Sequence, residues 1–195
     1  EFVMEVVKKP LSMGADRLIL LQDNSFSNLD SFGTAYALSK AIKKIGDYDL
    51  ILCGRQASDW DNAQVPLGLA EILGLPCITV AQKVEIMDGL VTSHRALPDG
   101  YQVVEASLPA LVTVTNELGE ARYATLRGIM SAGRKTPDVW DVDDLEIDRV
   151  KLQPKILVTK LSVPPKEQKC EFIQGENEAD SGRQLAIKLI ASLIS

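Results

Sequence analysis

The residues best placed to bind a small molecule lie in a polar loop at 54–65, which reads GRQASDWDNAQV. The apolar run LILCG at 50–54 predicts a strand before it, and Pro66 opens an apolar stretch that predicts a helix after it. Open α/β sheets bind ligands at such junctions, beyond the carboxyl ends of their strands. The loop lacks the GxGxxG and GxxxxGK spacings, so it is a candidate ligand loop of another type.

Backbone groups rather than side chains give this loop its best chemistry. Ala63, Gln64 and Val65 stand at the start of the expected helix, where unpaired N–H groups favour an anion such as phosphate. Asp59 and Asp61 are placed either to accept hydrogen bonds from ribose hydroxyls or only to cap the helix. On the pattern alone, a polar capping loop is therefore an alternative to a ligand site.

No pairing of a nucleophile with a base predicts catalysis. The single histidine, His94, falls in an expected hairpin and reads as a surface or packing residue. The cysteines are odd in number and too far apart for a disulfide framework or a zinc site, which favours a reducing compartment. Cys53 and Cys77 lie in apolar runs and read as small buried hydrophobes, while Cys170 lies in a polar stretch. We expect neither a catalytic residue nor a metal site.

Strands and helices alternate along the first half of the chain. Short apolar runs predict strands that are buried on both faces, at 17–22, 50–54 and 77–82. Helical spacing of apolar residues lies between them, from about Asp30 to Gly46 and from about Pro66 to Gly74. This alternation predicts a three-layer α/β/α fold with a mainly parallel sheet.

The second half changes character. An Asp88-Gly89 turn between two alternating runs predicts an antiparallel hairpin beside the parallel sheet. Residues 119–135 predict a weak helix or structured loop, because a partly helical pattern carries two internal glycines and four basic side chains. Residues 136–195 predict an extended arm that ends in an apolar helix from about 180 to 194. We therefore place a domain at 1–135 and the arm at 136–195.

Charge and length exclude some partners. The net charge of −6 and the pI near 4.9 argue against binding to nucleic acid or an anionic membrane surface. No stretch approaches the ~20 apolar residues that span a bilayer. The opening residues read as the end of a helix that runs directly into a strand, so we expect the domain to be incomplete at its N-terminus.

The order of motifs along the chain resembles that of electron transfer flavoprotein β-subunits. The loop at 54–65 is similar to the nucleotide loop of that family, which typically reads Gly-x-Gln-Ala and then Asp-x-Asp. Further blocks resemble family segments in the same order: MGADRLIL at 13–20, LPALVTVTNELGEARYATLRGIMSAGRK at 108–135 and VPPKEQKCEFIQG at 163–175. Two positions depart from the family pattern, since Ala121 replaces a usual proline and Trp60 replaces a small or acidic residue.

The resemblance implies an adenine-nucleotide α-hydrolase-like fold and a bound nucleotide, either AMP or a second FAD. The implied cofactor-binding residues are Gly54, Gln56, Asp59, Asp61, Asn62, Ala63, Gln64 and Val65. Their Ala-Gln-Val turn resembles that of electron-bifurcating members, which favours FAD. Segment 25–31 stands where such members approach the second flavin, although Asn28 replaces a glycine and Asp30 reads equally well as a helix cap.

The resemblance also implies protein partners. These are an α-subunit that binds the redox FAD and receives the arm, and flavin-dependent dehydrogenases. Residues 125–134 resemble the family's recognition loop, in which Ile129 or Met130 would be the apolar anchor with Arg127 and Arg134 as a charged rim, unless both apolar side chains pack internally. Glu105 would form an ion pair with the α-subunit.

The implied function is that of an electron-carrier subunit without catalysis of its own, in the cytoplasm or in the mitochondrial matrix of a eukaryote. Two other functions stay open. One is a stand-alone nucleotide-binding module of the same superfamily that senses or binds ATP, which would need a glycine-rich phosphate loop that this chain lacks. The other is an assembly subunit whose nucleotide site is degenerate.

Overall fold

The computed structural model describes residues 3–163, 165 and 170–194, and the chain forms two compact units that divide between residues 157 and 158. The helices of the first unit are α1 (Met4–Val7), α2 (Lys9–Ser12), α3 (Ser31–Ile45), α4 (Val65–Leu73) and α5 (Leu126–Arg134), with 3₁₀ turns η1 (Asn24–Phe26), η2 (Asn116–Leu118) and η3 (Arg149–Leu152). Its strands are β1 (Ile19–Leu21), β2 (Leu50–Gly54), β3 (Cys77–Met87), β4 (Leu90–Leu97), β5 (Gly100–Ser107), β6 (Ala110–Val114) and β7 (Asp138–Trp140).

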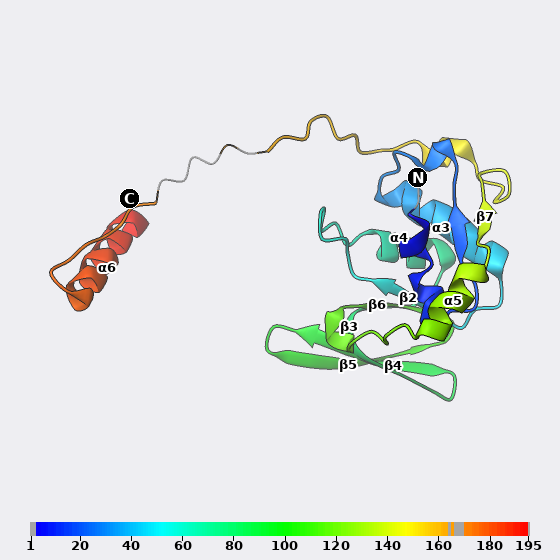
Figure 1. Cartoon of the computed structure of the whole chain (residues 1–195), viewed down its shortest axis with the longest axis horizontal. Coiled ribbons are helices and arrows are strands. Elements are labelled where there is room, and N and C mark those ends of the chain that lie inside the picture. The colour runs from blue at the N-terminus through cyan, green and yellow to red at the C-terminus, as the bar shows by residue number, and fades with distance from the viewer. Residues whose placement is uncertain (1–2, 164, 166–169, 195) are drawn as a thin grey trace. The chain divides into compact units, whose positions relative to one another are not determined.

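The strands of the first unit form a five-stranded sheet and a two-stranded sheet (Figure 1). The larger sheet has the order β2-β6-β3-β4-β5, with β6 parallel to both of its neighbours. In the smaller sheet β1 pairs with β7, also in parallel. Three of the five strand pairings are therefore parallel, and the two antiparallel pairings belong to the β3-β4-β5 insertion. Together with the helices that flank the strands, this confirms the predicted three-layer α/β/α class with an antiparallel insertion.

Strand β3 belongs to both the parallel and the antiparallel part of the sheet. Its first residues pair with β6, and its later residues pair with β4 after a register shift between Ala81 and Lys83. The pairing with β6 has a register shift of its own, between Ile78 and Ala81. There Val80 has a positive φ of 59°, and its N–H donates to the Thr113 hydroxyl at 2.9 Å. The sequence predicted two separate strands here, whereas the structure has one continuous strand that bends at a bulge.

The predicted hairpin is present between β3 and β4. Its Asp88-Gly89 turn has φ values of 51° and 76°, both positive. Two-residue hairpin turns of this kind need positive φ at both positions because that backbone follows the twist of the flanking strands. The local sequence was therefore sufficient to predict the insertion.

Helices α3 and α4 cover one face of the large sheet through a shared apolar cluster. Ala35 of α3, Leu69 and Ala70 of α4 and Leu111 of β6 are all buried in it. Gly68 brings the helices close together, since a Cβ at this position would lie 3.3 Å from the Ala35 Cβ. This cluster fixes α4 on the sheet and so fixes the loop that precedes it.

The first unit continues past residue 135, where we had expected the arm to begin. Val142, Leu145, Ile147 and Leu152 are buried against Tyr36, Ala37 and Ala41 of α3. Their spacing in the sequence is irregular because they lie in turns, irregular backbone and the short η3, so it shows neither a strand nor a helix period. That irregularity explains why the sequence pattern placed this segment in the arm.

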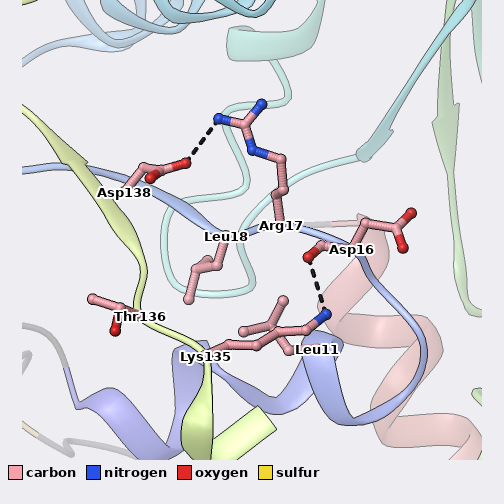
Figure 2. Close-up of a pocket in the computed structure, with 7 residues that line it drawn as sticks. All are labelled: Leu11, Asp16, Arg17, Leu18, Lys135, Thr136 and Asp138. Atoms are coloured by element: carbon pink, nitrogen blue, oxygen red, sulfur yellow. Dashed lines mark hydrogen bonds and ion pairs between the residues drawn. The ribbon is translucent and has the colours of Figure 1, made fainter. Parts of the chain in front are cut away.

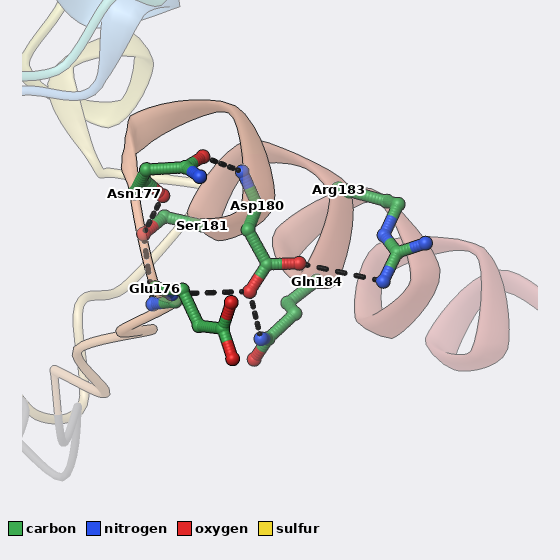
Figure 3. Close-up of polar contacts among 7 residues, drawn as sticks. Glu176, Asn177, Asp180, Ser181, Arg183 and Gln184 are labelled. Atoms are coloured by element: carbon green, nitrogen blue, oxygen red, sulfur yellow. Dashed lines mark hydrogen bonds and ion pairs between the residues drawn. The ribbon is translucent and has the colours of Figure 1, made fainter.

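The second unit consists of an extended segment and helix α6 (Glu178–Ile194). Figure 3 shows the start of α6, where the Asn177 side chain accepts from the Asp180 N–H at 2.9 Å. The Asp180 carboxylate in turn accepts from the Glu176 N–H at 3.2 Å and from the Gln184 amide at 2.8 Å. Such reciprocal capping satisfies backbone donors at the helix start. Pro164 and 166–169, which belong to the last block of family resemblance, lie outside the described residues.

Candidate functional site

The loop at 54–65 lies at the carboxyl edge of the large sheet, between β2 and α4. Gly54 ends β2 opposite Val114 of β6, and the Arg55 N–H extends this pairing by donating to the Val114 carbonyl at 3.1 Å. The Asp61 N–H donates to the Ala57 carbonyl at 3.0 Å and closes a turn within the loop. The structure therefore brings the predicted cofactor residues together on one short exposed loop above the sheet.

The backbone of this loop turns sharply just before α4. Ala63 has a φ of 51°, in the left-handed region, and Gln64 follows with φ −96° and ψ −31° in the right-handed region. Alternation of this kind turns successive N–H groups into one concavity, a nest that binds anions. Within the described part of the chain, the N–H groups of Ala63, Gln64 and Val65 donate to no protein acceptor. The three predicted phosphate donors are thus available at the N-terminus of a nine-residue helix.

The polar side chains of the loop divide into two groups. The Gln56 side-chain amide donates to Asp61 at 2.8 Å, so these two residues shape the loop. Asp59 and Asn62 are exposed, and their side chains make no hydrogen bond with the residues that the structure describes. The latter pair can therefore accept hydrogen bonds from a ligand, whereas Asp61 has one carboxylate oxygen already engaged.

A second strand end lies beside this loop and was missed in the sequence. Because β2 and β6 run in parallel with Gly54 opposite Val114, the residues that follow each strand meet at the same edge. After β6 these are Thr115, whose hydroxyl accepts from the Glu117 N–H at 3.4 Å, and Asn116. The signal that could have found them is a polar run directly after the apolar strand ALVTV.

Asp30 in segment 25–31 is engaged by backbone donors. Its carboxylate accepts from the Gly33 N–H at 2.8 Å and from the Lys155 N–H at 2.7 Å. These hydrogen bonds lower the pKa of Asp30, and the bond from the Gly33 N–H has the largest effect. Partial desolvation acts in the opposite direction but is outweighed. The helix-cap interpretation of Asp30 is confirmed, and the second oxygen binds the backbone of the distant segment before residue 157.

The thiols and the histidine have structural surroundings. Burial raises the pKa of Cys53 and that of Cys77, which keeps both as neutral thiols beside the α3–α4 cluster. The His94 ring stacks on Tyr101 with centroids 4.3 Å apart. Glu105 accepts from the Thr92 hydroxyl at 3.2 Å and is exposed. No nucleophile–base pair arises among these groups.

Helix α5 presents an exposed apolar face. Thr125 caps it by accepting from the Gly128 N–H at 3.0 Å. Leu126, Ile129 and Met130 occupy one helical face and are 76%, 53% and 56% exposed, respectively. Arg127 and Arg134, the expected rim, are exposed as well. Ile129 and Met130, for which internal packing is the alternative interpretation, are thus each about half exposed rather than buried in a core.

A hollow of about 320 Å³ lies elsewhere, beside β1, and none of the loop residues lines it. Figure 2 shows Arg17 paired with Asp138 at 2.8 Å, and Lys135 donating to the backbone carbonyl of Asp16 at 3.0 Å. Arg17, Lys135 and Asp138, three of the charged residues that line this hollow, thus already have protein partners. Across the described residues, no cluster of three or more potential metal ligands occurs and no helix is long and apolar enough to cross a membrane.

Comparison with known families gives one matching model, the electron transfer flavoprotein domain, over residues 2–145. The match includes the loop at 54–65 and helix α5, the two features with exposed binding chemistry.

Curated relatives support the same grouping. The chain is 42% identical, over 87% of its length, to the electron transfer flavoprotein subunit beta of Thermoanaerobacterium thermosaccharolyticum, and covers 66% of that protein. It is 36% identical, over 97% of its length, to the subunit of the same name from Megasphaera elsdenii, of which it covers 74%. It is also 39% identical, over 72% of its length, to the caffeyl-CoA reductase-Etf complex subunit CarD of Acetobacterium woodii, of which it covers 54%. The chain therefore spans less than two thirds of the length of the first and third of these relatives.

Proposed function

Because this chain belongs to the electron transfer flavoprotein β-subunit family, we propose that it binds an adenine nucleotide on residues 54–65 and serves as an electron-carrier subunit beside an α-subunit that holds FAD. Electrons would pass from a flavin-dependent dehydrogenase through flavin to an acceptor. The free cysteines suit a reducing compartment, which is the basis for proposing the cytoplasm. The subunit has a binding and docking role rather than a catalytic one.

The observation that carries the nucleotide proposal is the nest before α4. The left-handed Ala63 followed by the right-handed Gln64 is the backbone pattern that turns the N–H groups of Ala63, Gln64 and Val65 toward one point. They stand at a helix N-terminus, where the helix dipole adds positive potential. This arrangement fits a phosphate of AMP or of FAD. Asp59 and Asn62 would bind the ribose hydroxyls. A bound FAD would supply a second redox centre, whereas AMP would have a structural role.

The docking proposal rests on α5. A buried central apolar side chain with a polar rim is the usual energetic focus of a protein interface. Ile129 and Met130 would supply the apolar contact, and Arg127 and Arg134 would flank it. The Acetobacterium woodii relative is named as a subunit of a caffeyl-CoA reductase-Etf complex. A flavin-dependent dehydrogenase that acts on CoA thioesters is therefore a suitable partner with which to test docking.

Substitution at Gln64 tests the nucleotide site in the purified full-length heterodimer. Acid and heat would release the nucleotide for identification by chromatography. We expect either AMP or an amount of FAD greater than the α-subunit alone would hold. Gln64→Pro removes one N–H donor and restrains the preceding Ala63, so retention should fall well below that of Gln64→Ala. Thermal unfolding of both variants is the control for general damage. Equal retention in the two variants would mean that the backbone is not the anion holder.

A further inference from the structure

The two glycines inside α5 have different surroundings. A Cβ at Gly128 would lie 2.4 Å from the backbone carbonyl oxygen of Ser12 in α2, a distance that side-chain motion cannot relieve. A Cβ at Gly133 would meet nothing within 4 Å. Glycine costs helix stability relative to alanine, so its presence at position 128 is explained by the close approach of two backbones.

Other contacts attach the same side of α5 to the N-terminal segment. Ala132, one turn after Gly128, is buried. The Lys135 ammonium donates to the carbonyl oxygens of Ala15 and Asp16 at 3.2 and 3.0 Å, the latter drawn in Figure 2. Lys8 reaches the Gly133 carbonyl at 3.5 Å. α5 is thus attached along its length to the segment that contains α2 and the following loop.

The attached side and the exposed apolar face are different sides of one short helix. Successive residues of an α-helix are about 100° apart, so Ile129 points well away from the contact that Gly128 makes. A larger residue at 128 would push α5 from the α2 backbone, which would turn or shift the apolar face of Leu126, Ile129 and Met130.

We propose that Gly128 and Lys135 are positioning residues that set the orientation of the apolar face of α5 by seating the helix on the backbone of α2 and the loop at 14–16. The inference rests on the proposed docking role of α5. Docking would then depend also on α2 and the loop at 14–16, which do not themselves form the apolar face.

The test compares Gly128→Ala with the matched variant Gly133→Ala in the full-length heterodimer. A purified flavin-dependent acyl-CoA dehydrogenase serves as electron donor, reduction of an artificial dye serves as partner-independent activity, and hydrogen exchange reports on 8–16 and 126–134. Gly128→Ala should raise the half-saturating dehydrogenase concentration about fivefold or more, as a displaced interface anchor does. It should leave dye reduction unchanged and speed exchange in those two segments alone. Gly133→Ala should change none of these quantities.

Two further variants separate the possible failures. Lys135→Met removes the hydrogen bonds from α5 to the loop at 14–16 without introducing a steric clash. It should also raise the half-saturating dehydrogenase concentration, and Lys135→Arg should raise it less because a cationic donor is kept. If Ile129→Ala weakens docking but Gly128→Ala and Lys135→Met do not, the positioning role is wrong and the docking face stands. If Ile129→Ala and Met130→Ala leave docking unchanged, the docking face itself is wrong and the inference falls with it.

Discussion

Asp30 joins two segments that are far apart in the sequence, through one carboxylate. One oxygen caps α3 at the Gly33 N–H, and the other accepts from the Lys155 N–H. The Lys155 ammonium also lies 3.8 Å from the centre of the Phe32 ring. The charged form of Asp30 therefore stabilises both the start of α3 and the segment just before the boundary of the first unit.

Asp30→Asn should reduce the pH dependence of stability in acid. The folded-state pKa of Asp30 is lowered from 3.8, so its contribution is present above that value and is lost as the pH falls through the folded pKa. Thermal unfolding from neutral pH to below about pH 4 would measure it, with exposed Glu71→Gln of α4 as control. Asp30→Ala should cost about 0.5–2 kcal/mol near neutral pH through loss of the cap. A parallel pH profile for wild type and Asp30→Asn would contradict this role.

The sequence predicted half of what Asp30 does. Its residue type and position before an apolar helical pattern indicated the cap, which is a local interaction. The contact with Lys155 spans 125 positions, so no local pattern could reveal it. The positive φ of Ala63 was equally hidden, because alanine seldom adopts that conformation and only the surrounding loop imposes it.

At the scale of elements, the packing of α4 on β6 determines where the candidate ligand loop at 54–65 lies. Leu69 is 2% exposed between Ala35 and Leu111, so Leu69→Ala should lower the free energy of unfolding by about 2–5 kcal/mol. Leu67 lies on the same helix but is 47% exposed, so Leu67→Ala should cost no more than about 0.5 kcal/mol. Urea unfolding measures both variants. Equal losses of unfolding free energy in the two variants would mean that α4 does not pack on the sheet through Leu69.

Elements with a strong local sequence pattern were predictable, whereas features that depend on contacts between strands distant in the sequence were not. Helix α3, helix α4 and the Asp88-Gly89 hairpin followed from apolar spacing and turn residues. The bend within β3 did not, because it depends on the Thr113 hydroxyl of a neighbouring strand. The candidate ligand loop was found from its position after a strand, whereas Thr115 and Asn116 required knowledge that β6 lies beside β2.

At the scale of the whole molecule, the second unit exposes many large apolar side chains. Leu185, Ile187, Leu189, Ile190 and Leu193 of α6 are all exposed. Val158, Leu161 and Val163 of the preceding segment are exposed too. Large apolar side chains exposed in this number on one short segment are typical of a surface that a protein partner covers. The proposed α-subunit is the partner that would cover them.

Co-expression with the α-subunit should therefore raise the unfolding temperature of the full-length β-subunit markedly. Each aliphatic side chain of α6 that becomes buried contributes roughly 1.5–3 kcal/mol, and a partner at 100 times its dissociation constant stabilises the bound state by about 2.7 kcal/mol. Scanning calorimetry of the separate subunit and of the heterodimer would measure the shift. Leu189→Asn should shrink it, whereas Glu178→Gln, at the polar start of the same helix, should preserve it. An unfolding temperature that is identical with and without the α-subunit would contradict assembly through the second unit, since burial of these side chains cannot leave stability unchanged.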